Sequence, residues 1–333
     1  MTRYAIGVDI GATNMKLVLM DADGAILATE TSPTPKDSDP GAVVTGIISV
    51  TTAFLRHAND LGIQVDGFGF GIPHFHEGES WEQKQTNNMP SLEGYPMRPP
   101  LAQAFGSSLA MMNDVSAAGI AEHMFGRGRD VERMMMIAIG TGVGMSVVTQ
   151  EQGLVHFSWD SIGDAGMIIV DPLGQADCTC GGRGCLEALV SGPAIRQKAL
   201  REIERGKPTL LKTILQDRGD IEAKDVSEAA RAGDRVAMDL MEEAGFFLGV
   251  ALASYLHIFR PNLFVLGGGV SQAGDLLRDP AHRTLGRLAS PWYFARLRGI
   301  EFAALGKDAA AIGCASLILH PGRYVRDRPL PLS

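Results

Sequence analysis

Two similar strand–turn–strand units constrain this fold more than any other feature of the sequence. Each half of the chain contains one glycine turn between two apolar segments of strand character. The first unit has strands at 4–8 and 15–20 around the turn 9–14, and the second has strands at 133–139 and 144–149 around the turn 140–144. Turns rich in glycine and threonine direct backbone N–H groups and hydroxyls at one anion. The repeat therefore predicts two similar domains that grip one phosphate tail.

The rest of the chain alternates between strand and helix patterns, which predicts an α/β fold. Further strands are expected at 25–30, 65–72, 109–113, 263–266 and 300–304, and helices at 41–61, 115–125, 192–205, 226–231, 234–259 and 309–319. The segment 73–100 shows little periodicity and is expected to be a long functional loop. A chain of 333 residues can form two domains of ordinary size.

Three of the four cysteines, Cys178, Cys180 and Cys185, lie within eight consecutive residues of a glycine-rich segment. The spacing C-x-C-x4-C lets three thiolates converge on one point, as a tetrahedral Zn2+ site requires, with a fourth ligand from elsewhere. Two other interpretations are three small buried residues in a tight loop and a disulfide. Small residues in a turn do not need to be cysteine, and a disulfide is unusual in a chain without a secretion signal. Zinc is therefore the favoured interpretation.

The charge of the chain argues against nucleic acid and anionic membranes as partners. The net charge is −8 and the isoelectric point is about 5.5. Residues 1–9 have the pattern of a strand and not of a basic region followed by an apolar signal core, and no membrane span is expected. The cysteines then fit a reducing compartment, so we expect a cytoplasmic location.

Several motifs together resemble one known family. They are 9–16 (DIGATNMK), Asn113-Asp114, 140–144 (GTGVG), 266–270 (LGGGV) and 163–167 (GDAGM) followed by the cysteine run. They are similar to the first phosphate motif, the catalytic Asn-Asp pair, the second phosphate motif, the adenosine motif and the signature of the ROK family. That family comprises sugar kinases and related repressors of the hexokinase/actin/Hsp70-like ATPase superfamily. The resemblance extends from Tyr4 to about Leu319, which is nearly the whole chain.

The resemblance implies two actin-like domains of the ribonuclease H type with a central cleft. The smaller domain would comprise residues 1–118 with a C-terminal helix at about 309–333. The larger domain, residues 119–308, would carry the cysteine loop and the surface of a homodimer. The resemblance also implies ATP with Mg2+ as the phosphoryl donor and a sugar in the cleft as the acceptor.

Phosphoryl transfer needs a base for the proton of the attacking hydroxyl, and Asp114 is the candidate. The alternative is that Asp114 only caps the helix that follows it. By the resemblance, Asn113 would hydrogen-bond the same sugar, and Asp9 would hold Mg2+ through water. Lys16 is interpreted as an ordinary exposed strand lysine. The nucleotide is expected to contact Asp9, Gly11, Ala12, Thr13, Asn14, Gly140, Thr141, Gly142, Gly267, Gly268 and Gly269.

Sugar recognition requires polar side chains that pair each hydroxyl, because unpaired buried polar groups are costly. By the resemblance, these side chains are Asn88, Asn113, Asp114, Asp164 and Glu187. His74 stands where the family usually has a glycine beside the sugar, so it either lines that pocket or is an ordinary surface or core histidine.

Two departures from the family pattern concern the signature. Asp164 replaces a glutamate, and Met167 replaces a histidine that in the family supports the sugar and supplies the fourth zinc ligand. One residue more than usual also separates Met167 from Cys178. A thioether is a poor Zn2+ ligand beside three thiolates, and it cannot pair with a hydroxyl as imidazole does. Zinc is therefore in doubt, and we expect a substrate that differs from glucose at the group that this histidine supports, or glucose itself.

The resulting prediction is an ATP-dependent kinase for a primary hydroxyl of a hexose or a close mimic, with Asp114 as the base. One alternative is a kinase for a seven-carbon cyclitol or an amino sugar. Another is a catalytically weak sugar-binding or regulatory member of the family. A repressor is disfavoured because only eight residues precede Asp9, whereas repressors carry a winged helix-turn-helix there.

Overall fold

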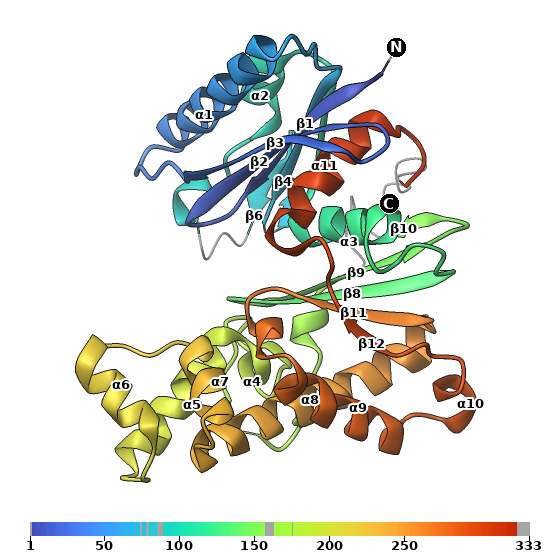
Figure 1. Ribbon diagram of the computed structural model, residues 1–333. Coiled ribbons are helices and arrows are strands. Elements are labelled where there is room, and N and C mark those ends of the chain that lie inside the picture. The colour runs from blue at the N-terminus through green and yellow to red at the C-terminus, as the bar shows by residue number, and fades with distance from the viewer. Residues whose placement is uncertain are drawn as a thin grey trace. The chain divides into compact units, whose positions relative to one another are not determined.

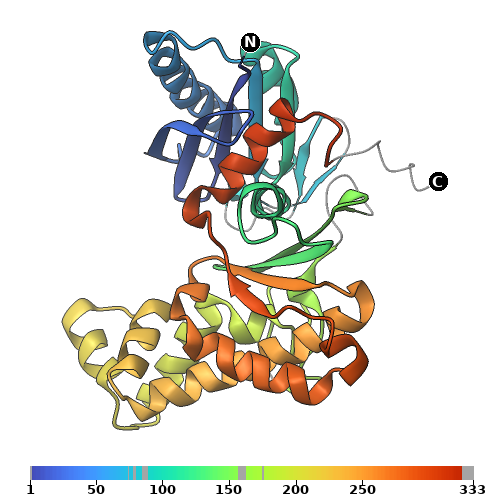
Figure 2. The same ribbon diagram turned by 45° about the vertical axis from the view of Figure 1, so that its right-hand side comes forward.

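The chain folds into two compact units (Figure 1, Figure 2). This computed structural model describes residues 2–73, 75–77, 80–84, 89–156, 163–174 and 176–324. Unit 1 comprises Met1–Asp130, Ser146–Gly163 and Ala304–Ser333, and unit 2 comprises Val131–Met145 and Asp164–Ala303. The domain boundaries expected from the sequence stay a prediction.

Unit 1 contains a mixed sheet with the strand order β3-β2-β1-β4-β7. The strands are β1 (Tyr4–Ile10), β2 (Asn14–Asp21), β3 (Ile26–Pro33), β4 (Gly67–Ile72) and β7 (Leu109–Asn113). β1, β2 and β3 pair antiparallel, whereas β4 pairs parallel with both β1 and β7. The carboxyl ends of β1, β4 and β7 therefore meet at one edge, together with the turn that joins β1 to β2.

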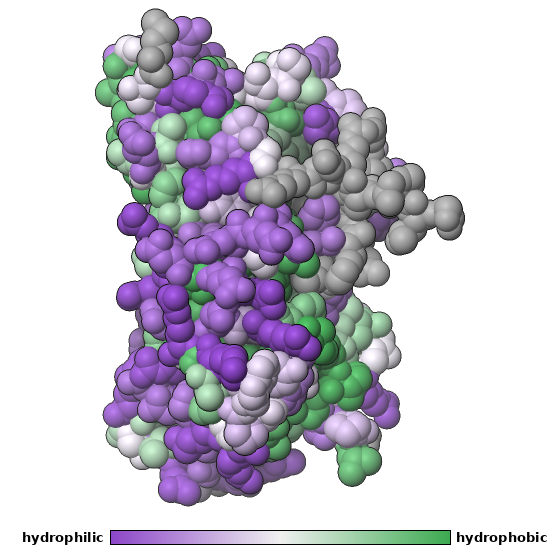
Figure 3. Space-filling view, turned by 90° about the vertical axis from the view of Figure 1, so that its right-hand side faces the viewer, coloured by the Kyte–Doolittle hydropathy of each residue, from purple (hydrophilic) through white to green (hydrophobic). Residues whose placement is uncertain are grey.

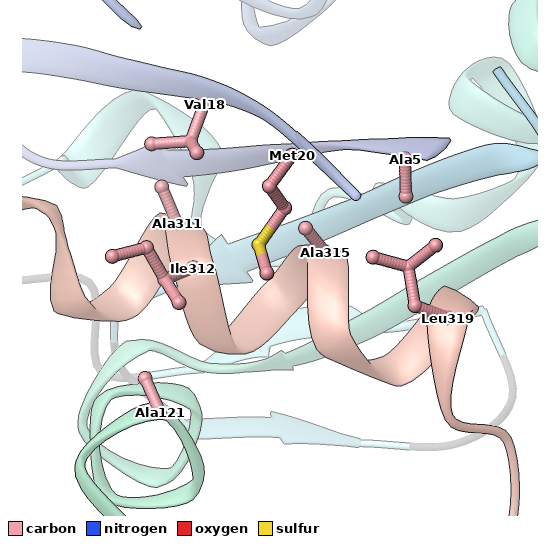
Figure 4. Packing of buried hydrophobic residues seen from close by; sticks show 8 residues of the cluster. All are labelled: Ala5, Val18, Met20, Ala121, Ala311, Ile312, Ala315 and Leu319. Atoms are coloured by element: carbon pink, nitrogen blue, oxygen red, sulfur yellow. The ribbon is translucent and has the colours of Figure 1, made fainter. Parts of the chain in front are cut away.

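Helix α11 (Ala309–Leu319) packs closely on one face of this sheet because two strands have glycine beneath it. A Cβ at Gly7 would lie 1.8 Å from the backbone oxygen of Ala311, and a Cβ at Gly69 would lie 2.0 Å from that of Cys314. Figure 4 shows the small side chains of α11 facing those of the strands. The cluster comprises Ala5, Val18, Met20, Ala121, Ala311, Ile312, Ala315 and Leu319.

Helices α1 (Pro40–Asp60) and α2 (Arg98–Phe105) cover the other face of the sheet (Figure 1). Phe105 of α2 stacks near Phe68 and Phe70 of β4, with ring centroids 4.6 and 5.8 Å apart. Among the described residues, α1 alone is long and apolar enough to cross a membrane by length and composition. One face of this helix, which includes Ile47 and Phe54, is buried in the core of unit 1.

A second sheet has the order β10-β9-β8-β11-β12. The strands are β8 (Arg133–Ile139), β9 (Val143–Thr149), β10 (Gly153–Val155), β11 (Leu263–Gly267) and β12 (Ile300–Phe302). β11 pairs parallel with β8 and β12. The helices are α4 (Glu187–Val190), α5 (Gly192–Glu204), α6 (Leu210–Arg218), α7 (Ala223–Arg231), α8 (Arg235–Phe259), α9 (Asp275–Leu288) and α10 (Pro291–Phe294).

The two glycines of α8 bring α9 against it. A Cβ at Gly245 would lie 2.3 Å from the Pro280 ring, and a Cβ at Gly249 would lie 2.5 Å from the backbone oxygen of Ala281. These two small residues therefore serve the interior of unit 2.

Several elements were missed by the sequence analysis. The segment 73–100, expected to be a loop, contains a two-stranded sheet of β5 (Phe75–Glu77) and β6 (Glu82–Lys84), the 3-10 helix η1 (Pro90–Leu92) and the start of α2. The helices α4, α6, α9 and α10 were also not expected. Helix α3 (Asp114–Phe125) was predicted from the sequence. Three short 3-10 helices were not: η2 (Ala165–Met167), η3 (Val270–Ala273) and η4 (Gly306–Asp308).

Candidate functional site

Two carboxylates and a lysine gather at the carboxyl edge of the sheet in unit 1. Asp9 pairs across the β1–β2 hairpin with Lys16, and the Lys16 ammonium lies 3.2 Å from Asp9 Oδ2. Asp114 directly follows β7, and Gly71 of β4 pairs with Asp9 on one side and with Met112 of β7 on the other. A Cβ at Gly71 would lie 3.7 Å from the Cα of Asp114. The nearest atom to that Cβ would be the sulfur of Cys314 in α11, at 3.0 Å, so the glycine leaves room for this helix beside Asp114.

The start of α3 bears on one of the two roles considered for Asp114, the capping role. The helix is capped by Asn113, whose Oδ1 accepts hydrogen bonds from the backbone N–H groups of Val115 (3.0 Å) and Ser116 (3.1 Å). Asp114 is the first helical residue, and its Oδ1 accepts from the same Val115 N–H at 2.8 Å. Asp114 is therefore not the capping residue. Because the side-chain oxygen of Asn113 already accepts these two hydrogen bonds, a hydrogen bond from Asn113 to a sugar would come from its amide nitrogen.

Burial raises the pKa of Asp114 to about 7, and the negative charge of Asp9 acts in the same direction. The Val115 N–H and the ammonium of Lys16 lower it, but they do not outweigh burial. Burial also raises the pKa of Asp9, and there Lys16 is the main opposing group. A carboxyl group with a pKa near 7 can accept a proton from a hydroxyl and release it again at neutral pH.

The turn between β1 and β2 is held by backbone and by one buried threonine. The N–H of Gly11 donates to the oxygen of Asn14 (3.1 Å), and the hydroxyl of Thr34 donates to the oxygen of Gly11 (2.5 Å). The N–H of Thr34 donates to the oxygen of Thr13 (2.9 Å). Thr13 and Asn14 are exposed, while Gly11 and Ala12 are partly exposed. The side chains of this turn are therefore available to a ligand at the same edge as Asp9.

The glycine segments of unit 2 lie together at the carboxyl ends of β8 and β11. Gly140 and Gly142 close the turn after β8 with an N–H to oxygen bond of 2.9 Å. Gly268, after β11, has φ +83° and a Cβ there would lie 2.3 Å from the oxygen of Ile139. The N–H of Gly192, at the start of α5, donates to the oxygen of Gly140. Carboxyl ends of parallel strands are common ligand sites, and here two of them carry glycines.

Glu187 contacts both the turn 140–144 and the signature segment 163–167. Its Oε2 accepts from the N–H of Val143 (2.9 Å), and its Oε1 accepts from the hydroxyl of Thr179 (3.0 Å). Gly166 lies close by, since a Cβ there would lie 3.3 Å from the Cβ of Glu187. Burial, and next the charge of Glu187, raise the pKa of Asp164 to about 6. The structure thus brings Asp164, Glu187 and the 140–144 turn together.

The three cysteines converge as their spacing predicts. The sulfur atoms of Cys178, Cys180 and Cys185 all lie within 4.8 Å of one another, and those of Cys180 and Cys185 are 3.6 Å apart. Zn–S bonds of about 2.3 Å in a tetrahedron place sulfur atoms about 3.8 Å apart, so these three thiols fit a zinc ion. The N–H of Gly182 donates to the sulfur of Cys180 and lowers its pKa, which favours the thiolate that a metal needs.

Two expected sugar residues, His74 and Asn88, lie outside the described part of the chain. The sequence analysis missed Lys16 as a partner of Asp9, although counting outward from the β1–β2 turn places residue 16 opposite residue 9. Thr34 and Thr179 were also not predicted, because their contacts with Gly11 and Glu187 depend on how the chain folds back and leave no local pattern. Lys16 is only partly exposed, so its interpretation as an ordinary exposed strand lysine was wrong.

Comparison with known proteins agrees with these motifs. The model of the ROK family matches residues 5–320. The chain is 31% identical to the glucokinase of Thermotoga maritima over 314 residues, which are 94% of this chain and 96% of that protein. A crystal structure of a ROK family glucokinase from Streptomyces griseus, in complex with glucose and AMPPNP, has a TM-score of 0.78 and 30% identity, and covers 94% of this chain and 98% of that chain.

A ROK family transcriptional regulator described as a homolog of the Escherichia coli MLC protein is also similar. Its crystal structure has a TM-score of 0.84 and 25% identity, and covers 96% of this chain and 78% of that chain. The similarity to ROK kinases confirms the expected fold class, an α/β protein of two actin-like domains. Since the family match covers nearly the whole length, the chain belongs to the ROK family.

Proposed function

We propose that the chain is an ATP-dependent kinase that phosphorylates a primary hydroxyl of a hexose or a hexose-like derivative, with Asp114 as the general base. The observation that carries this proposal is the placement of Asp114 beside Asp9, with a pKa raised to about 7 and with the capping role taken by Asn113. An aspartate with only a structural role would not benefit from a position where burial and a second carboxylate raise its pKa. The similarity to glucokinases over nearly the whole chain supports the same reaction.

The proposal assigns the other groups as follows. Asp9 would hold Mg2+ through water, and the turns 11–14, 140–142 and 267–269 would contact ATP. Mg2+ neutralises charge on the phosphates when it is bound. Asp164 and Glu187, with Asn113 and the residues His74 and Asn88, would pair the sugar hydroxyls. The enzyme would act in the cytoplasm, as a homodimer.

Asp164 and Met167 bear on the identity of the sugar. Asp164 is one methylene shorter than the glutamate of the family, and Met167 offers no hydrogen bond to a hydroxyl. Either change leaves space or an unpaired group where a standard hexose would bind. A substituted hexose, an amino sugar or a seven-carbon cyclitol is therefore a second candidate substrate, at the same site and with the same base.

The test is turnover of purified protein with ATP, Mg2+ and a panel of hexoses, amino sugars and cyclitols. Asp114→Asn retains the shape of the side chain and removes the proton acceptor, so kcat should fall by about three orders of magnitude or more while sugar binding weakens far less. Asp217→Asn, on the exposed surface of α6, is the matched control. Unchanged turnover of a folded Asp114→Asn protein would assign the base to another residue.

The same panel separates the kinase from a sugar-binding regulator. The high structural similarity to a ROK transcriptional regulator motivates this second candidate. A regulator of this kind would bind a sugar of the panel, as measured by calorimetry, without turnover in the wild-type chain. Turnover that depends on Asp114 would exclude it.

A further inference from the structure

We propose that Thr179, the residue between the first two cysteines, is a positioning residue that orients Glu187 for sugar binding. The inference rests on the proposed function, which takes Glu187 as a sugar ligand. The family motif gives no role to Thr179. The hydrogen bond from Thr179 to Glu187 would also be the contact through which the cysteine loop acts on the sugar site.

The first support is the way in which Glu187 is held. Each of its carboxylate oxygens accepts one hydrogen bond, Oε1 from the Thr179 hydroxyl at 3.0 Å and Oε2 from the Val143 N–H at 2.9 Å. Gly142 makes room for this carboxylate, because a Cβ there would lie 2.6 Å from Oε2. The terminal torsion of glutamate is soft and roughly two-fold, so a bond to each oxygen is what fixes the plane of the carboxylate.

The second support is the neighbour of Glu187. Asp164 is close enough that the charge of Glu187 contributes to the raised proton affinity of its carboxyl group. Two carboxylates that share one site repel each other, and a free Glu187 would rotate away. The Thr179 hydroxyl opposes this rotation by donating to the oxygen that the backbone does not hold.

The third support is the position of Thr179 in the cysteine loop. The loop is a tight turn in which the N–H of Cys178 donates to the oxygen of Gly182 (2.9 Å) and the N–H of Gly181 donates to the oxygen of Cys178 (3.0 Å). Thr179 lies between two of the three cysteines that fit a metal ion, so any change at the sulfur atoms moves its hydroxyl. The hydrogen bond from Thr179 therefore links the side chains of that loop to Glu187.

A second path from the loop to Glu187 exists along the backbone, since Cys185 precedes Glu187 by two residues. Thr179→Val removes the hydroxyl, keeps the branched shape and leaves the backbone path intact. Thr179→Ser retains a hydroxyl and is the matched control. The two variants thus separate the hydrogen bond from the chain connection.

The first arm measures glucose binding by titration calorimetry without nucleotide, in the full chain. Thr179→Val should raise the dissociation constant for glucose about five- to tenfold, which is the net effect of losing one ordinary hydrogen bond. Thr179→Ser should stay within about twofold of wild type, and ATP binding should be the same in all three proteins. Equal glucose binding by Thr179→Val and wild type would overturn the proposal.

The second arm tests the link to the cysteine loop through Cys180, which is exposed. Cys180→Ser should weaken glucose binding, and the double variant with Thr179→Val should bind no more weakly than Thr179→Val alone. Additive effects would show that the loop acts through the backbone, which contradicts the proposal.

A third measurement does not depend on the proposed function. Amide hydrogen exchange of the peptide that contains Val143 should become faster in Thr179→Val, because a rotating Glu187 releases that N–H. Faster exchange without glucose binding by the wild type would refute glucose as the ligand and retain the positioning role. Unchanged exchange would overturn the positioning role itself.

Discussion

The cluster of Asp9, Lys16 and Asp114 in unit 1 shows how neighbouring charges set the pKa of a single residue. Asp114 is influenced by burial and Asp9 in one direction and by Lys16 in the other, and the balance leaves its pKa at about 7. A base with this pKa is protonated in acid and ionised above neutral pH. The reaction needs the ionised form, so kcat/KM should rise with pH through about 7 and reach a plateau above it.

Lys16 provides a test of this balance. Its ammonium lowers the pKa of Asp114, so Lys16→Met should raise that pKa and move the rise in kcat/KM to higher pH by roughly half a unit to one unit. The pH–rate profile from pH 5.5 to 9 measures the shift. Lys224→Met is the control, because Lys224, like Lys16, pairs with a carboxylate, but its partner Glu228 lies with it on the exposed surface of α7. If the midpoint of the Lys16→Met profile lies at the same pH as that of wild type, this account is contradicted, whatever the value of kcat/KM at the plateau.

At the same scale, the sequence predicted some site residues and not others. Asp9, Asp114 and the three cysteines lie in short motifs that resemble those of the family, so they could be proposed as site residues without a structure. Lys16 depends on hairpin register, and Thr179 depends on a loop that folds back on Glu187. Those contacts arise only when the chain is folded. His74 and Asn88, outside the described residues, stay predictions.

At the scale of elements, the cysteine loop is expected to be a metal site with an incomplete ligand set. We expect one zinc per chain in protein purified without added metal, bound less tightly than by three cysteines and one histidine, because Met167 cannot supply the imidazole. Met167→His should tighten the metal and shift preference towards glucose-like sugars. Elemental analysis and a chelator competition measure the first effect, and the sugar panel measures the second. Protein without zinc and with three freely titrating thiols would refute the site.

The contact between α11 and the sheet gives a second prediction about elements. Gly69→Ala places a Cβ 2.0 Å from the oxygen of Cys314, so the helix must move away from the strand. The free energy of unfolding should fall by about 1–3 kcal/mol, as measured by chemical denaturation. Gly41→Ala, at the start of α1 with only ordinary contacts to Asp39, should leave stability unchanged or slightly higher. Equal loss in both variants would show that Gly69 matters for its flexibility and not for space.

Strands and long amphipathic helices were predictable because hydrophobic periodicity marks them directly. Helix α9 was not, since it contains Pro280 and several charged residues, a pattern that favours a break. The proline is accommodated because Gly245 of α8 offers it space. Helix α2 was also missed, because Pro99 and Pro100 in its first turn, where proline is tolerated, resemble the end of a loop. In α9, by contrast, tertiary packing outweighs local propensity, and its partner helix α8 lies elsewhere in the sequence.

At the scale of the whole molecule, the repeated strand–turn–strand pattern predicted a protein of two similar halves, because each half must bury its own sheet. The family match over nearly the whole chain agrees with this expectation. What the pattern could not indicate is which surface remains for a partner. That surface depends on which apolar side chains the finished fold leaves exposed.

Exposed apolar residues of unit 2 indicate where a second copy is expected to bind. Ile258, Leu288 and Trp292 are 68%, 51% and 56% exposed, and Figure 3 shows hydrophobic residues on the surface of this unit. The end of α8 and the start of α10 lie side by side, since the N–H of Ser290 donates to His257 at 3.0 Å. Large exposed apolar side chains that gather in one place are typical of protein interfaces.

The resulting prediction is a homodimer through this end of unit 2. Light scattering at micromolar concentration should give twice the chain mass of 35.5 kDa. Ile258→Lys should shift the particle towards the monomer, because a charge in a symmetric interface faces its own copy and is desolvated there. Leu61→Lys changes a side chain of similar exposure, 51%, at the end of α1 in unit 1 and should leave the mass unchanged. A wild-type particle of 35.5 kDa would refute the dimer, and a dimer that tolerates Ile258→Lys would place its interface on another face.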